Sequence, residues 1–255
     1  MNAALRKTCA LTSKDLADLF KNPGMAVCLV IPVALVFFQV MMIGDTGSEV
    51  AAAHPEASAM IASTFLQSAL CMSIAMIGSM AVLYSLAEEK EKHTLRTLIL
   101  SNVSAGQIMV AKAVVGTLAI VLVAAVCFGV VWHQLPGVNA ALLPAYLLLV
   151  LAGSATVVVP SLVLGLACRD QMTASFYSVP VVMLSLAPIF GAYGEGLGTV
   201  VLFAPTGGVA KLLDMAVMGT FSWGDAVLPL VVTAAWVVAG AVAFKLLYRR
   251  LVRDN

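Results

Sequence analysis

Six long apolar segments dominate this chain and restrict it to one class of fold. They cover approximately residues 25–43, 60–87, 113–132, 142–167, 173–193 and 226–247. Each is close to or above the roughly 20 residues that a helix needs to cross about 30 Å of hydrocarbon. Lipid offers no partners to open backbone groups, and the runs are too long and unbroken for the alternating strands of a barrel. The sequence therefore predicts an all-α integral membrane protein with six transmembrane helices.

The composition agrees with this class and leaves no room for a second large domain. Hydrophobic residues make up 62% of the 255 residues and charged residues 11%, with a mean hydropathy of +1.03, whereas soluble domains carry about 25% charged residues. We expect a cytoplasmic amphipathic helix over residues 1–24 and a six-span membrane domain over residues 25–255. The net charge of +1 does not indicate nucleic acid, and no nucleic-acid partner is expected.

Lysine and arginine gather on one side of the predicted topology. If both termini lie inside, the inner side holds Arg6, Lys7, Lys14, Lys21, Lys90, Lys92, Arg96, Lys112, Arg169, Lys245, Arg249, Arg250 and Arg253. The outer side holds Lys211 together with Asp45, Glu49, Glu56, Glu195 and Asp214. Because cytoplasmic loops are enriched in lysine and arginine, we expect a multi-pass protein of the cell membrane with both termini in the cytoplasm.

The predicted spans lack the residues that most membrane chemistry requires. No Asp, Glu, Lys, Arg or His lies in the middle of any span, which disfavours an ion-driven transporter and a membrane enzyme. His54, His93 and His133 are far apart and near loops, so no shared metal site is expected. The five cysteines are scattered without a C-x-x-C pair. No P-loop motif is present, so any ATP must be bound by another chain.

The residues before the first span have the pattern of a short amphipathic helix. Thr12 and Asp15 resemble a capping pair at its start, and Asn22-Pro23 is expected to end it. Its apolar face is formed by Leu16, Leu19 and Phe20. Such a helix is expected to lie in the plane of the membrane interface, either as a simple anchor or in a docking role.

The only long charged interval runs from Glu88 to Lys112, between the second and third spans. Glu88 and Lys92 have the spacing of a stabilising helical ion pair, and Leu95, Leu98 and Ile99 follow as a small apolar patch. Ser104 and Gln107 predict a capping box at the start of the next helix, with Val103 and Ile108 at the positions of a hydrophobic staple. The pattern predicts a helix, a turn and a second helix on the cytoplasmic side. A solvated loop with a few interfacial leucines is the alternative.

This interval resembles the membrane subunits of exporter-type ABC transporters, the type-2 ABC permease family. That family typically shows E-K-E-x-x-T-L, then leucines, Ser-Pro and a Gly-Lys before the third span. The chain has Glu89-Lys90-Glu91, Thr94-Leu95, Leu98-Ile99-Leu100, Ser101 and Lys112, and it departs at Asn102 and Ala111. Phe20-Lys21-Asn22-Pro23 with Pro32, and the run from Pro205 through Leu212-Leu213 to Gly219, resemble further parts of the family.

The resemblance implies a function for the charged interval. It would be the coupling helix that docks on a separately encoded ABC ATPase, present in two copies, which binds ATP and Mg while this chain binds no cofactor. The coupling residues would be Glu88, Glu89, Lys90, Glu91, Thr94, Leu95, Leu98 and Ile99. Residues 194–224 would form two short helices that dip into the membrane from outside, with a plain outside loop as the alternative.

The resemblance also implies an assembly and a transport activity. The chain would be the non-catalytic permease subunit of an ATP-driven exporter, working in the bilayer as a homodimer or with a related permease. Its substrate would be an amphipathic drug, a peptide or a lipid. The alternative is a membrane sensor or immunity component that binds a toxin, peptide or lipid without transporting it.

Overall fold

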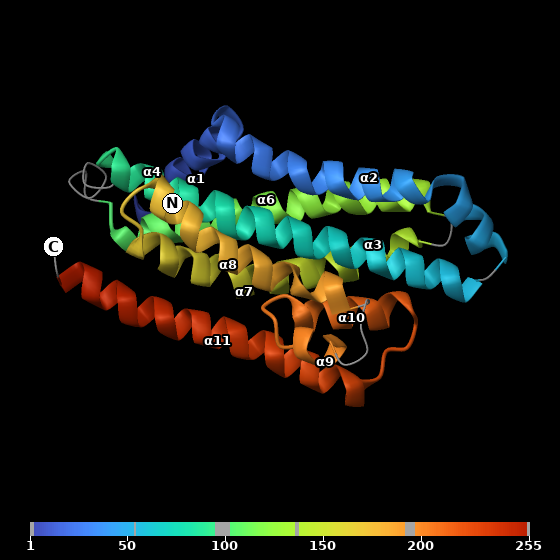
Figure 1. Ribbon diagram of the computed structural model, residues 1–255. Helices are drawn as coiled ribbons and strands as arrows, with labels where there is room; N and C mark the ends of the chain where they lie inside the picture. Colours follow the sequence, from blue (N-terminus) through green and yellow to red (C-terminus); the bar gives the residue numbers. More distant parts are fainter. Residues whose placement is uncertain (1–2, 54, 95–102, 136–137, 192–196, 254–255) are drawn as a thin grey trace.

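The described part of the protein is a bundle of long helices with no strand. The computed structural model describes residues 3–53, 55–94, 103–135, 138–191 and 197–253, and within these ranges all regular structure is helical (Figure 1). Six helices in these ranges are long and apolar enough to cross a membrane. The prediction of an all-α membrane protein with six spans is confirmed.

The six candidate spans correspond one to one to the predicted apolar segments. The first span is Pro23–Met42, within α2 (Pro23–Ala53), and the second is Ala57–Glu91, which runs through α3 (Pro55–Ala75), η1 (Met76–Ala81) and α4 (Val82–Glu91). The third span is Gly106–Gln134, within α6 (Ala105–Gln134), and the fourth is Ala140–Ala167, which consists of η2 (Ala140–Leu142) and α7 (Leu143–Ala167). The fifth span is α8 (Gln171–Phe190), and the sixth is Trp223–Leu247, within α11 (Trp223–Arg253).

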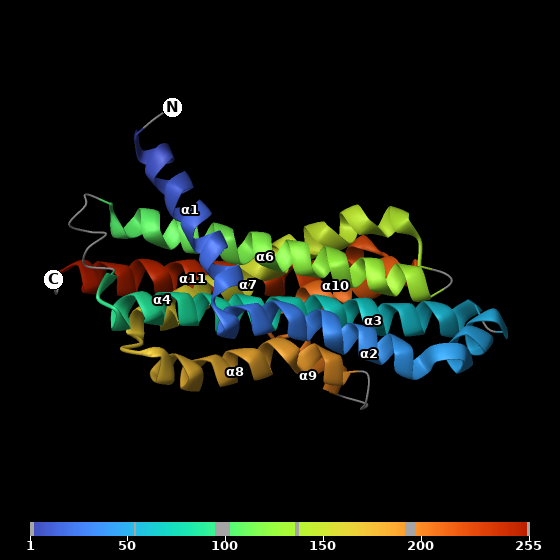
Figure 2. The ribbon, with the colours of Figure 1, turned by 90° about the horizontal axis from the view of Figure 1, so that it is seen from above.

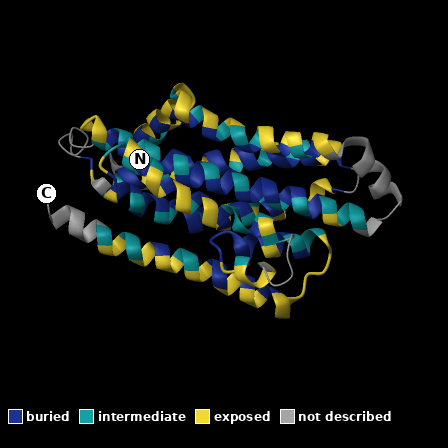
Figure 3. Ribbon diagram, in the orientation of Figure 1, coloured by how far each residue is buried: buried dark blue, intermediate teal, exposed yellow. Residues whose placement is uncertain are grey.

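The second span is the centre of the bundle. The most apolar stretch of Ala57–Glu91 is 72% buried, against 28% for α8 and 22% for α11. Six of the largest fully buried side chains belong to this span, namely Leu66, Leu70, Ile74, Ile77, Leu83 and Leu86. A π-helical turn, η1, interrupts it halfway. Figure 3 shows buried residues inside the bundle and exposed ones on the outward faces of α2, α8 and α11, where apolar side chains can meet lipid.

Helix α1 (Ala3–Lys21) lies within the predicted range 1–24, but it begins before the start that the capping pattern at Thr12 predicts. The expectation that Thr12 and Asp15 cap it is wrong. Thr12 lies inside the helix, where its hydroxyl donates to the carbonyl of Thr8 at 2.9 Å, a bond that a threonine within a helix makes with the preceding turn. The end of the helix is as predicted, since α1 stops at Lys21 and α2 begins at Pro23.

Helix α1 crosses the bundle instead of running along it. Figure 2 shows it passing over α6 and leaving to the side, at the same end of the bundle where α11 finishes. Of its three predicted interfacial residues, Leu19 is buried in the protein core, whereas Leu16 and Phe20 are exposed. The helix therefore rests on the protein through Leu19 and presents Leu16 and Phe20 outward, as an interfacial helix does.

Two short helices precede the last span, as predicted. They are α9 (Leu197–Val201) and α10 (Gly207–Val217). Helix α10 packs on α3, α7 and α11, and Ser63 on α3 donates to Asp214 on α10 at 2.8 Å. The described residues of this segment are thus helices packed on the spans and not a plain loop, while their depth in a membrane stays a prediction.

At Gly208, α10 approaches α11 closely. A Cβ at this position would lie 2.3 Å from Thr233 Oγ1 and 2.4 Å from the carbonyl oxygen of Pro229. The second neighbour is backbone and cannot rotate away, so only glycine allows this contact.

Gly208→Ala is expected to lower the free energy of unfolding by about 1–3 kcal/mol, because the added methyl group overpacks the contact between α10 and α11. Thermal unfolding of the purified protein in detergent measures the change. Gly129→Ala in α6 is the control, since a Cβ there meets nothing within 4 Å. Equal stability of the two variants would contradict the close contact.

Candidate functional site

The predicted coupling residues that the structure describes lie where α4 ends, at the end of the bundle that carries α1. Glu88 to Glu91 form the last turn of α4, and Lys92 caps it. His93 follows with a positive φ of 55°, which turns the chain sharply. The ends of α1, α6, α7 and α8 surround this turn, so its charges have several neighbours within the chain.

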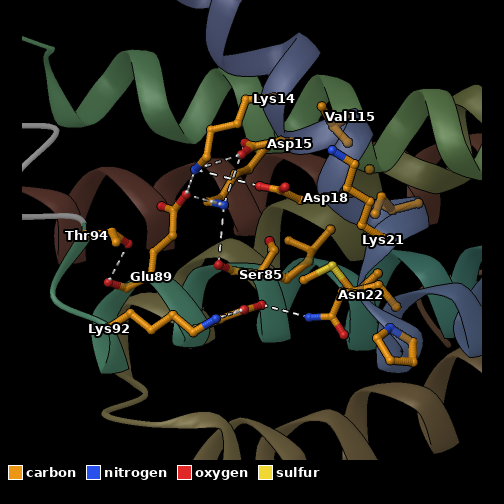
Figure 4. A pocket seen from close by; sticks show the side chains of 18 residues that line it. Lys14, Asp15, Asp18, Lys21, Asn22, Ser85, Glu89, Lys92, Thr94 and Val115 are labelled. Carbon is orange, nitrogen blue, oxygen red and sulfur yellow. Dashed lines mark hydrogen bonds and ion pairs between the residues drawn. The ribbon is translucent and has the colours of Figure 1, made fainter.

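A cluster of four charged side chains ties α4 to α1 and α6. We call Lys14, Asp15, Glu89 and Lys112 the charge cluster. The Lys112 ammonium lies 3.3 Å from Glu89 Oε1 and 3.7 Å from Asp15 Oδ2 (Figure 4). Lys14 lies 3.4 Å from the same Glu89 oxygen and 3.9 Å from Asp15 Oδ1. Two positive and two negative groups thus join three helices that are distant in sequence.

Burial makes the charge cluster energetically important. Asp15, Glu89 and Lys112 are 8%, 7% and 4% exposed, and a charge buried this far is tolerated when it is paired. Lys112 also donates to the backbone carbonyl of Ser85 at 3.3 Å. Lys14 is the half-exposed member, so Lys112 is the ammonium on which the two buried carboxylates chiefly depend.

Burial also raises the pKa of Asp15 above its ordinary value of 3.8; the Lys112 ammonium opposes the shift and the Glu89 carboxylate adds to it. The folded protein therefore holds the Asp15 proton more tightly than the unfolded chain does. As the pH rises from the unfolded pKa through the folded one, this residue's contribution to stability falls. Burial therefore disfavours the charged form of Asp15 by more than the attraction of the Lys112 ammonium favours it.

Two charges of α4 hold the turn between α7 and α8. Lys90 donates to the carbonyl of Leu166 and, at 2.9 Å, to that of Cys168. Glu91 accepts the backbone N–H of Gln171 at 3.1 Å. The Lys90 ammonium thus binds free carbonyl groups at the carboxyl end of α7, and the Glu91 carboxylate binds a free N–H group at the amino end of α8. Each charge is opposite in sign to the partial charge of the helix end that it meets.

Glu88 holds the joint between α1 and α2. Its carboxylate accepts from Asn22 Nδ2 at 2.9 Å and from Lys92 Nζ at 2.5 Å. The Glu88–Lys92 pair is the helical pair that the spacing predicts. Asn22 is the single residue between α1 and α2, so α4 fixes the direction in which the first span leaves the interfacial helix.

The structure divides the predicted coupling residues into two groups. Glu88, Glu89 and Lys90 face other helices of the same chain, whereas Glu91 and Thr94 are exposed. Thr94 donates to the carbonyl of Glu89 at 3.1 Å. Leu95, Leu98 and Ile99 lie outside the described residues. The predicted capping box is present, because Ser104 and Gln107 exchange both hydrogen bonds at the start of α6, and Val103 and Ile108 are both buried.

Sequence reasoning missed the role of Asp15, Lys14 and Lys112 as one cluster. The capping pattern places Asp15 at a helix cap, and apolar length places Lys112 at the boundary of a span. The position of Lys112 is a signal for such a cluster. It lies seven residues beyond the first residue of α6, too far inside the helix for a lysine that only marks the end of a span. Within the described ranges, no group of three or more His, Cys, Asp and Glu could hold a metal ion.

A cavity of about 500 Å³ lies beside the charge cluster. It is bounded by α1, the start of α2, α4 and α6 (Figure 4). Its polar wall combines four lysines and four acidic residues, which are Lys14, Lys21, Lys92, Lys112, Asp15, Asp18, Glu88 and Glu89. Leu19, Met25, Val82 and Val115 contribute apolar wall.

Lys112→Met is expected to lower the free energy of unfolding by about 3–5 kcal/mol, because it leaves Asp15 and Glu89 without their buried partner. Unfolding of the purified protein in detergent measures the loss. Lys245→Met, an exposed lysine on α11, is the matched control and should change little. The double variant Lys112→Met/Glu89→Gln should lose less than the sum of the two single variants. Simple additivity would contradict the cluster.

Comparison with known proteins assigns the chain to a family. Residues 48–245 match the family model described as ABC-2 family transporter protein. A search of the curated proteins finds no match. The matched region contains α3 to α10 and most of α11, and thus the whole charged end of α4. The chain therefore belongs to the ABC-2 transporter family, as a multi-pass permease subunit that works with an ABC ATPase.

Proposed function

We propose that this chain is the permease half of an ATP-driven exporter and that the exposed end of α4 receives the ATPase. The ATPase is a separate chain in two copies, which binds ATP and Mg. Two permease chains, identical or related, enclose the pathway for an amphipathic drug, peptide or lipid. The termini and the end of α4 face the cytoplasm, in keeping with the lysines and arginines at that side.

One observation carries the coupling role. The last turn of α4 is bonded to α1, α6, α7 and α8 through Glu88, Glu89, Lys90 and Glu91. A displacement applied just beyond this turn is therefore passed to several helices together. In addition, α4 continues through η1 into α3, the most buried span, so the displacement also reaches the centre of the bundle.

The contacts also indicate which residues meet the ATPase. Glu88, Glu89 and Lys90 have partners within the chain, so they position the end of α4. Glu91, Lys92 and Thr94 also bond within the chain, but together with His93 they are exposed and present a surface to another protein. Charges at the edge of an interface select and orient a partner, whereas buried apolar side chains supply most of the affinity. Leu95 and Leu98 are proposed for that second role.

Glu91→Arg is expected to weaken ATPase binding roughly tenfold, about 1.4 kcal/mol, and Leu95→Asp by about 2 kcal/mol or more. Both variants should insert into the membrane as the unchanged protein does, since Glu91 is exposed and Leu95 belongs to the charged interval between two apolar segments. Co-purification of tagged permease with its ATPase measures binding. Asp225→Arg, an exposed acid at the start of α11, is the matched control. Full ATPase recovery with both coupling variants would refute the assignment.

Reconstitution of the permease with its ATPase in liposomes tests export itself. Amphipathic compounds that are transported should raise ATP hydrolysis and accumulate on the side away from the ATPase. Hydrolysis that stays constant across a broad compound set, combined with tight binding of one compound, would instead favour the sensor. Glu91→Arg should reduce the stimulation at a given ATPase concentration, measured against the basal hydrolysis of the ATPase without permease.

A further inference from the structure

The cavity beside the charge cluster has the features of a site for a small zwitterionic group. Its volume of about 500 Å³ falls in the range of ligand pockets, about 300–1,000 Å³. We propose that it binds the headgroup of a phospholipid that carries both a phosphate and a primary ammonium, as an ethanolamine headgroup does. The proposal concerns a resident lipid and holds whatever the exported substrate is.

The charges of the wall balance one another. Four lysines and four carboxylates line the cavity, so the wall offers no net attraction to a purely anionic or purely cationic ligand. A zwitterion can place its phosphate on the lysines and its ammonium on the carboxylates at once. A headgroup with a single charge would leave one set of wall charges without a new partner.

Lys21 is the lysine most available for a phosphate. Among the described residues it has no ion-pair partner, whereas Lys14, Lys92 and Lys112 each pair with a carboxylate. Figure 4 shows Lys21 on the opposite side of the cavity from Glu89. The ammonium of Lys21, which has no ion pair among the described residues, therefore lies across the cavity from the Glu89 carboxylate, while Lys14 and Lys112 stand beside Glu89.

Glu89 supplies the acceptor that selects a primary ammonium. It is 7% exposed, and its Oε2 has no hydrogen-bond partner in the described structure, although Oε1 pairs with Lys14 and Lys112. A buried carboxylate oxygen without a donor is costly. An ethanolamine ammonium in the cavity can donate an N–H bond to it after a rotation of the Glu89 side chain that turns this oxygen toward the cavity. A choline headgroup has no N–H, and a glycerol headgroup has no positive charge.

The position of the cavity fits a lipid better than a free solute. The first span begins at Pro23 and the second ends at Glu91, so the charged wall lies at the level of the lipid headgroups. Met25 and Val82 lie further along these two spans, and Val115 lies along the third span, Gly106–Gln134, at the depth where acyl chains begin. A headgroup held here would contact α1 and α4 together and reinforce their joint at Asn22.

Lipid retention by the full-length protein tests the proposal. The protein is purified from nanodiscs containing equal amounts of phosphatidylethanolamine, phosphatidylcholine and phosphatidylglycerol, and tightly bound lipid is quantified by native mass spectrometry. We expect phosphatidylethanolamine to be enriched about tenfold over each of the others, a factor that one additional charged hydrogen bond provides. Equal retention of the three lipids would overturn the proposal.

Two variants locate the bound lipid. Glu89→Gln should bring the retention of phosphatidylethanolamine down to that of phosphatidylcholine, since the negative charge that attracts the ammonium is lost and one carboxylate oxygen is replaced by an NH2 donor. Because this change also touches the charge cluster, Lys21→Ala serves as the independent variant and should reduce retention about tenfold. Lys245→Ala, on an exposed part of α11 away from the cavity, is the matched control. Unchanged retention with Lys21→Ala would refute the site.

Soluble glycerophosphoethanolamine separates a lipid from a free solute. The detergent-purified protein is incubated with this compound before the lipid is added. Competition only at concentrations far above that of the lipid supports a membrane lipid as occupant. Displacement at equal concentration would show that the cavity takes a free phosphoamine, which would overturn the lipid assignment.

Discussion

The buried ammonium of Lys112 is the constraint on which the charged end of this permease depends. A lysine that is 4% exposed needs carboxylates close by, and its carboxylates come from Glu89 on α4 and Asp15 on α1. Three helices therefore have to meet at one point. Once they meet, Glu88 reaches Asn22, and Lys90 and Glu91 reach the turn between α7 and α8. The direction of α1 across α6 follows from the same pairing.

The contacts at the end of α4 give its charged residues two different roles. In the sequence they form one polar interval with a conspicuous motif, and every member has the appearance of a partner-binding residue. In the fold, Glu88, Glu89 and Lys90 are used within the chain, and the exposed surface begins at Glu91. The proposed coupling role needs both groups, because the outward residues must be held firmly by the inward ones. The amphipathic helix α1 belongs to the same unit, since its Asp15 and Lys14 complete the charge cluster.

Much of the fold could be predicted from local rules. The six spans follow from apolar length, the Ser104–Gln107 capping box from a four-residue pattern, and the Glu88–Lys92 pair from helical spacing. The same kind of reasoning failed at Thr12, where the capping pattern is present but α1 begins at Ala3. A capping pattern is weak within a sequence that is helical on both sides, because the helix gains more from continuing than from stopping.

By itself the sequence determined the class of the protein, the number of its spans and the family to which its charged interval is similar. These depend on hydropathy and on neighbours within a turn or two of helix. Only the tertiary structure decided which charges are internal, that α1 is tied to α4 and α6, and that a charged cavity lies between them. The partners of Lys112 and Glu89 are set by how distant helices pack, and no local pattern encodes the packing of helices far apart in the chain.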